Sequence, residues 1–104
     1  MKFLCLHGYG TNSEFLKLQM TRMISVLKHH EFIFLDGRYE CHHQFIEPIV
    51  YNTISRFDNC RFCSWIYKEK DGSYCKYSYD ESTKQIVAYI KENSIDGIVA
   101  FSQG

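Results

Sequence analysis

The residues best suited to chemistry lie at positions 100–104, where the chain reads Ala-Phe-Ser-Gln-Gly. They follow an Asp-Gly pair and the short apolar run Ile-Val-Ala at 98–100, a pattern typical of a parallel strand buried on both faces. Apart from the alanine, the five residues match Gly-x-Ser-x-Gly, a sharp strand-to-helix turn that exposes a serine hydroxyl above a sheet. The pattern predicts Ser102 as a nucleophile. On these five residues alone, a serine in an ordinary turn is the alternative.

Two further strands and a helix must position this serine. The apolar run in Lys2–Leu6 predicts a buried strand that ends in a glycine-rich loop at 7–10. Thr11 and the glutamate three residues later fit a capping box that opens a helix running to about His30. A third run, at 32–35, completes a strand–helix–strand unit with parallel strands and a right-handed crossover. The expected apolar face of the helix comprises Leu16, Met20, Met23, Ile24 and Leu27.

Residues 38–79 show weaker patterns and carry Trp65 and six of the eight tyrosines. No periodicity is clear around Pro48, whereas residues 64–68 and 74–79 flank an Asp-Gly turn and fit a hairpin or two extended arms. Such a long insertion is uncommon in a compact domain unless it covers a site or has structure of its own. A substrate-covering segment is one interpretation, and simple packing of aromatic side chains is the other.

A second helix, capped by Asp80 or Ser82 and ending near residues 93–94, precedes the last strand at 97–101. The expected fold class is therefore α/β: a three-stranded parallel sheet of order 2-1-3 with two crossover helices and an irregular aromatic-rich insertion. With 104 residues the chain forms one domain at most.

Composition narrows the classes of partner. Twelve basic residues balance twelve acidic ones, which removes the general electrostatic argument for binding nucleic acid or an anionic membrane. No apolar run approaches the roughly 20 residues that span a bilayer, and the N-terminal run is too short for a signal peptide. We therefore expect no nucleic acid, no membrane and a cytoplasmic location.

The five cysteines are an odd number, which favours reduced thiols over a disulfide framework. Cys60 and Cys63 form a Cys-x-x-Cys pair that the run Cys41-His42-His43 and Cys75 could complete as a zinc site. Because a second close-spaced pair of ligands is missing, scattered thiols in an aromatic segment are the simpler interpretation, and we expect no metal.

Taken together, four motifs resemble the FSH-type serine hydrolases, small members of the α/β-hydrolase superfamily. They are the opening strand with its His-Gly-Tyr loop at 3–9, Phe-Leu-Asp-Gly at 34–37, the tryptophan-containing approach to the second helix at 64–82, and residues 96–104. The last is the most specific, since these enzymes commonly have Asp-Gly-Ile-x-Gly-Phe-Ser-Gln-Gly there. The resemblance covers the whole chain but only the front half of the family's domain.

The resemblance implies that Ser102 attacks the carbonyl of a small-molecule ester or thioester without a cofactor. It also implies that the backbone N–H groups of Tyr9 and Gln103 hold the oxyanion. In the family, the histidine at the position of His7 supports the loop, so we do not expect it to be the catalytic base.

The triad acid and base follow the serine in α/β-hydrolases, whereas His29, His30, His42 and His43 all precede Ser102. We therefore expect residues 1–104 to be an incomplete hydrolase domain that is weak or inactive alone, with exposed apolar faces that promote self-association. The alternative is a non-catalytic interaction module, with a metal bound through its cysteines and histidines.

Overall fold

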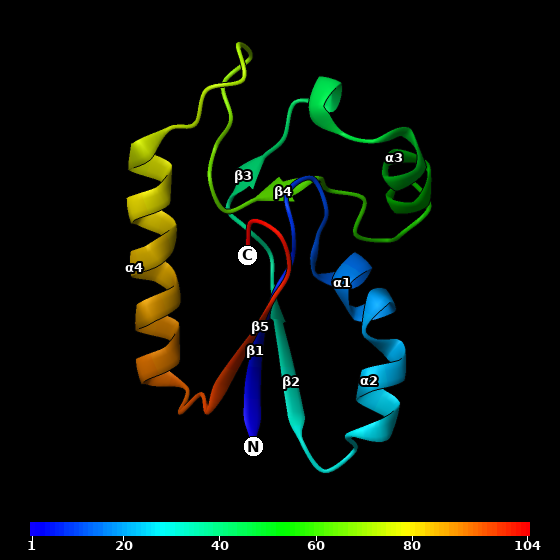
Figure 1. Cartoon of the computed structure of the whole chain (residues 1–104), viewed down its shortest axis with the longest axis vertical. Helices are drawn as coiled ribbons and strands as arrows, with labels where there is room; N and C mark the ends of the chain where they lie inside the picture. The colour runs from blue at the N-terminus through cyan, green and yellow to red at the C-terminus, as the bar shows by residue number, and fades with distance from the viewer.

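A computed structural model describes residues 1–104 and contains a three-stranded parallel sheet between two helical layers (Figure 1). Strands β1 (Lys2–Leu6), β2 (Glu31–Leu35) and β5 (Gly97–Ala100) lie in the order β2-β1-β5. Both pairings are parallel, with Leu4 opposite Ile33 on one side and Ile98 on the other. The α/β class and the predicted 2-1-3 order are confirmed.

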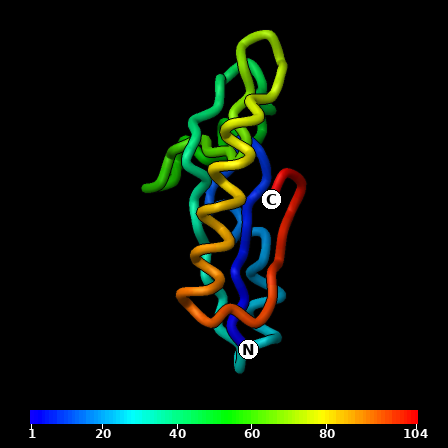
Figure 2. Tube along the Cα trace, turned by 90° about the vertical axis from the view of Figure 1, so that its left-hand side faces the viewer, coloured from blue at the N-terminus to red at the C-terminus, as the bar shows by residue number.

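Alternation along the central strand divides the core into two apolar clusters, because successive side chains point to opposite faces of a sheet. Leu4 and Leu6 pack with Trp65 and the helix α4 (Lys76–Glu92) on one face. Cys5 packs with Leu16 and its helix on the other. Figure 1 shows these layers side by side, with α4 on one side of the sheet and α1 and α2 on the other, and Figure 2 shows the sheet facing the viewer behind α4.

The first crossover helix is divided into α1 (Ser13–Gln19) and α2 (Thr21–Val26). Its N-cap is Asn12 rather than the predicted Thr11: the Asn12 side chain accepts a hydrogen bond from the Phe15 N–H at 2.9 Å. The predicted capping box is wrong because the carboxylate of Glu14 instead accepts a hydrogen bond from the Asn59 N–H at 3.2 Å.

The division at Met20 is a bend and not a gap in the helical hydrogen bonds. The Met20 N–H donates to the Leu16 carbonyl, and the Ile24 N–H donates to the Met20 carbonyl, both at 2.9 Å. The Thr21 hydroxyl donates to the Leu18 carbonyl at 2.8 Å, a back-bond that commonly bends helices. The helix ends at Val26, before the predicted His30, since the chain must turn to begin β2 at Glu31.

Helix α4 begins at Lys76 with Cys75 as its N-cap residue, five residues before Asp80 and seven before Ser82, the two predicted caps. Its first two turns bury two serines against the preceding segment. The Ser78 hydroxyl accepts a hydrogen bond from the Tyr67 N–H at 2.7 Å, and the Ser82 hydroxyl donates to the Trp65 carbonyl. These polar contacts, which an apolar pattern does not reveal, extend the helix toward its N-terminus.

The insertion lies at the carboxyl end of the sheet, at the top of Figure 1. It contains the short antiparallel pair β3 (Tyr39–Glu40) and β4 (Cys63–Ser64), the 3-10 turn η1 (His43–Phe45) and the helix α3 (Pro48–Ile54). Helix α3 was not predicted from the sequence, although proline in the first helical turn is a common helix start.

The predicted hairpin around the Asp-Gly turn is correct only near the turn. Lys68 and Tyr74 form a single antiparallel bridge, and the Glu69 N–H donates to the Ser73 carbonyl at 2.8 Å. The second arm is not extended beyond this point, because α4 begins at Lys76. No helix in the structure has the length and apolar character needed to cross a membrane. All five cysteines are free.

Candidate active site

Ser102 lies in a tight bend directly after β5. Its φ angle is 55°, in the left-handed region that few non-glycine residues adopt, and its side chain is exposed. The bend turns back over the carboxyl end of β1 (Figure 1). There Gly8 approaches so closely that an added Cβ would lie 3.2 Å from the Ser102 Cβ. The structure therefore brings together the serine and the glycine-rich loop that sequence analysis paired.

Small residues are needed around this bend for a steric reason. A Cβ added to Gly104 would lie 2.5 Å from the Leu6 carbonyl oxygen and 2.7 Å from that of His7. By contrast, Ala100 sits in the β5 ladder opposite Leu6, where an alanine is accommodated. The departure from Gly-x-Ser-x-Gly thus falls at the position that tolerates a methyl group.

The Gln103 side chain fastens the bend to the segment that precedes α4. Its Oε1 accepts hydrogen bonds from the Trp65 N–H at 2.8 Å and the Ile66 N–H at 3.3 Å, and its Nε2 donates to the Ile66 carbonyl. The Trp65 indole N–H in turn donates to the His7 carbonyl at 2.9 Å. One buried tryptophan thus links both loops around Ser102.

Two backbone N–H groups beside Ser102, those of Tyr9 and Gln103, donate to no group of the protein. The preceding Gly8 carbonyl accepts hydrogen bonds from the His7 Nδ1 and the Thr11 hydroxyl, each at 2.8 Å. Because a trans peptide directs its C=O and N–H in opposite directions, these bonds orient the Tyr9 N–H away from Thr11. Free and oriented N–H groups of this kind are suited to binding an anionic oxygen.

His7 is fully buried, and both of its ring nitrogens are used by the backbone. Its Nε2 accepts from the Gly37 N–H at 2.8 Å, so the proton resides on Nδ1, which donates to the Gly8 carbonyl. Burial lowers the pKa of His7, outweighing the Gly8 hydrogen bond and the Asp36 charge. A neutral imidazole with no free lone pair cannot take a proton from Ser102, so His7 supports the loop.

The end of β2 is joined to the same region by Asp36. Its carboxylate accepts from the Ser13 N–H at 2.8 Å and the Asn59 side chain at 3.1 Å. Burial would raise the pKa of Asp36, but the hydrogen bonds from Ser13 and Asn59 outweigh it and hold that pKa below its usual value. Asp36 therefore ties β2, α1 and the insertion together as a carboxylate.

A groove of about 370 Å³ opens beside Ser102. The glycine-rich loop and α1 form one side of it, and the insertion contributes apolar side chains that sequence analysis did not identify. The apolar cluster around Pro48 was the only sequence pattern that could have indicated them. The groove is lined by Gly8, Tyr9, Gly10, Thr11, Phe15, Gln19, Phe45, Ile46, Glu47, Val50, Phe101 and Ser102.

The remaining histidines make their contacts elsewhere. His30 lies beside the N-terminal amine at 3.1 Å, and the His42 Nε2 lies 2.9 Å from the Tyr67 hydroxyl. The Ser102 hydroxyl forms no hydrogen bond within the chain. The structure also brings together no group of three or more histidine, cysteine, aspartate or glutamate side chains that could hold a metal ion. Cys63 is buried while Cys60 is exposed.

Comparison with known proteins identifies the family of the chain. Esterase alnB of Emericella nidulans is 34% identical to the chain over 106 residues, covering 99% of the chain and 33% of the esterase. The chain thus spans about a third of the length of the curated relative it matches. The sequence model of the family described as serine hydrolase (FSH1) matches residues 1–104. The chain therefore belongs to the FSH1 serine hydrolase family.

Proposed function

We propose that the chain carries the nucleophile and the oxyanion hole of an enzyme that hydrolyses carboxylic esters or thioesters. The observation that carries this proposal is the exposed Ser102 in a left-handed bend, beside the unpartnered N–H groups of Tyr9 and Gln103. Membership of a serine hydrolase family and similarity to an esterase support the same reaction class.

In the proposed reaction, the Ser102 Oγ forms a bond to the substrate carbonyl carbon as its proton passes to a base. The carbonyl oxygen becomes an oxyanion that accepts hydrogen bonds from the two free N–H groups. Collapse of the intermediate expels the alcohol or thiol, which takes up the proton. Water then attacks the acyl-serine ester, releasing the carboxylic acid and restoring the serine hydroxyl.

Residues 1–104 do not position a general base at the Ser102 hydroxyl. An unactivated serine is a weak nucleophile, and no histidine hydrogen-bonds to Ser102 in the structure. We therefore propose that residues 1–104 react slowly alone, and that the acid and base come from polypeptide outside them. The length of the esterase relative leaves room for such a segment.

Labelling with a fluorophosphonate tests the nucleophile directly, because this probe phosphonylates activated serines. We expect slow labelling of the chain that the Ser102→Ala variant loses completely. Ser94→Ala is the matched control, since Ser94 is the other serine with a positive φ angle and it lies at the far end of β5. Labelling that persists in Ser102→Ala would contradict the proposal. A folded chain in which no serine is labelled would also contradict it.

A further inference from the structure

The Lys68 ammonium lies among three aromatic rings. Its Nζ is 4.4 Å from the centroid of the Phe45 ring, 5.4 Å from that of Tyr74 and 5.5 Å from that of Tyr9. All three distances are within the roughly 6 Å at which a cation is attracted to the face of a ring. The charge is thus held in one place on a half-buried side chain.

Lys68 has no anionic partner in the protein. The ion pairs of the structure join Arg38 and Lys84 to Glu81, and Arg61 to Glu40, whereas no carboxylate lies within 4.0 Å of Lys68. Ring faces attract a cation but do not neutralise it. The ammonium therefore remains able to donate hydrogen bonds to an anion and to balance its charge.

Two of the three rings also form the groove beside Ser102. Tyr9 and Phe45 line that groove, so the ammonium is only one ring away from the space that a substrate would occupy. The only charged residue lining the groove is Glu47, whose side chain is exposed and therefore screened by solvent and salt. The groove is otherwise neutral, and the Lys68 ammonium lies against two of its rings without itself lining the groove.

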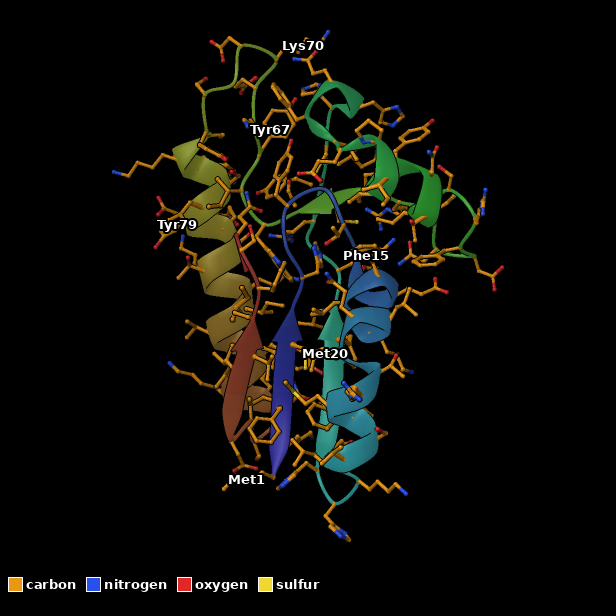
Figure 3. All side chains as sticks on the ribbon, turned by 45° about the vertical axis from the view of Figure 1, so that its right-hand side comes forward. Met1, Phe15, Met20, Tyr67, Lys70 and Tyr79 are labelled. Carbon is orange, nitrogen blue, oxygen red and sulfur yellow. The ribbon has the colours of Figure 1, made fainter.

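The backbone around Lys68 is held in place by hydrogen bonds on both sides. The Lys68–Tyr74 bridge closes the 69–73 turn, and the Gln44 side chain donates to the Lys70 carbonyl at 2.8 Å. Figure 3 shows the loop carrying Tyr67 and Lys70 packed against the η1 region of the insertion. The cation is therefore positioned before any ligand arrives, which lowers the entropic cost of binding.

We propose that Lys68 forms an anion subsite of the Ser102 groove, and that the preferred substrates are esters or thioesters whose acyl chain ends in a carboxylate. The placement of the ester carbonyl at Ser102 rests on the proposed function, whereas the anion subsite at Lys68 does not. The acyl chain would lie along the Tyr9 and Phe45 rings, with its carbonyl at Ser102 and its terminal carboxylate at the Lys68 ammonium.

A cage of aromatic rings could in principle take a quaternary ammonium group instead. The structure disfavours this ligand because Lys68 already occupies the rings and is tethered to them by its own backbone. A cationic ligand would have to displace the Lys68 ammonium, which its own backbone keeps at high effective concentration beside the rings. It would also be repelled by the positive charge of that ammonium. An anion meets attraction at the same position.

Binding of three methyl esters to the Ser102→Ala chain tests the subsite without turnover. They share one chain length and differ only at the far end: monomethyl adipate is anionic, methyl hexanoate is neutral, and methyl δ-trimethylammoniovalerate is cationic. Titrations followed by NMR chemical shifts of the backbone amides give each dissociation constant. We expect monomethyl adipate to bind about tenfold tighter than methyl hexanoate, since hydrogen bonds to charged groups are worth roughly 1.5–3 kcal/mol.

Variants of two lysines in one loop identify the cause. Lys68→Met, which keeps an unbranched apolar stem, should remove the preference for the anion, and Lys68→Arg should restore most of it. Lys70→Met is the matched control, because Lys70 is exposed and contacts the insertion through its backbone carbonyl. It should leave the preference unchanged.

The proposal is overturned if the three esters bind equally, if the cationic ester binds best, or if Lys70→Met abolishes the preference as Lys68→Met does. The comparison of the three esters needs no Lys68 variant, so a misfolded variant does not spare the proposal. Loss of fluorophosphonate labelling with the ester preference intact would refute the proposed function alone. Labelling without the preference would refute the anion subsite alone.

Discussion

At the scale of the residue, the backbone of Ser102 carries a conformational cost that a glycine would avoid. Only Ser94 and Ser102 among the non-glycine residues have positive φ angles, 51° and 55°. Ser94 follows α4 near a helix end, where such a conformation is common. Ser102 lies in the turn closed by the hydrogen bond from the Gly104 N–H to the Phe101 carbonyl at 3.0 Å, and strained backbone of this kind gathers at functional sites.

The two serines make a matched pair of glycine substitutions. Both Ser94→Gly and Ser102→Gly should raise the free energy of unfolding by about 0.5–1 kcal/mol, because glycine adopts a positive φ without steric cost. Only Ser102→Gly should abolish fluorophosphonate labelling. Urea denaturation followed by the fluorescence of Trp65, the single tryptophan, measures the stability. A loss of stability in Ser102→Gly would show that its side chain is structural.

His7 gives the fold a pH dependence whose sign follows from its lowered pKa. The folded state binds the proton more weakly than the unfolded chain, whose histidine pKa is about 6.5. The contribution of His7 to the free energy of unfolding is thus fully present above that pH. It falls as the pH drops below that value, by up to about 1.4 kcal/mol per pH unit. The lowered pKa of Asp36 acts in a separate, more acidic range, below its ordinary value of 3.8.

Unfolding free energies measured between about pH 7.5 and 5 should therefore decline steeply in the wild type. His7→Gln, whose amide can still accept and donate, should be less stable overall but show a flatter pH profile. His29→Gln, at an exposed position, is the control and should keep the wild-type slope. An unchanged slope in His7→Gln would mean that another group senses the pH.

At the scale of the element, the start of α1 joins the sheet to the insertion. The buried Asn12 caps α1, and its Nδ2 also donates to the Asn59 carbonyl at 2.8 Å and the Arg61 carbonyl at 2.9 Å. One side chain thus holds the helix and the segment leading to β4. The groove beside Ser102 depends on this joint, since its walls come from both elements.

Asn12→Ala should lower the free energy of unfolding by about 2–3 kcal/mol, since it removes a helix cap and leaves buried carbonyls without their donor. Asn12→Ser keeps a capping oxygen, but its shorter side chain cannot donate to the Asn59 and Arg61 carbonyls. It should lower the free energy of unfolding by roughly half as much. Ser25→Ala on exposed α2 should change stability by less than about 0.5 kcal/mol. Equal losses for both Asn12 variants would assign the whole effect to the lost Nδ2 donor and none of it to the cap.

At the scale of the whole molecule, β5 lies at an edge of the sheet and pairs only with β1. Beside this open edge, Ile98 and Phe101 are 50% and 56% exposed, and Val87 of α4 is also exposed. Unpaired strand edges next to apolar side chains promote association between chains. The predicted self-association would use this edge.

We expect residues 1–104 to form dimers or larger species at high concentration, with a second copy pairing along β5. Ile98→Lys should shift the chain toward monomer, because a charge on an edge strand discourages pairing. Sedimentation velocity over a range of concentrations measures the change. Val26→Lys, at a distant and exposed position of α2, should not alter it. A chain that stays monomeric at every concentration would contradict this expectation.

The sequence alone determined the features that depend on neighbouring residues. Short apolar runs and the turns that follow them defined β1, β2 and β5, and sequential βαβ units allow few arrangements, so the 2-1-3 order followed. The small residues around Ser102 indicated a tight bend for the same local reason. Helix boundaries were less predictable, since Asn12, Ser78 and Ser82 form their deciding hydrogen bonds with distant segments.

Only the tertiary structure decided which distant groups meet. It fixed the tautomer of His7 through Gly37, fastened Gln103 to Trp65, and placed Lys68 against rings of the glycine-rich loop and the insertion. Each of these contacts joins residues far apart along the chain, whose approach depends on how the whole insertion packs. Local patterns carry no information about such packing, and the chemical character of the groove beside Ser102 depends on it.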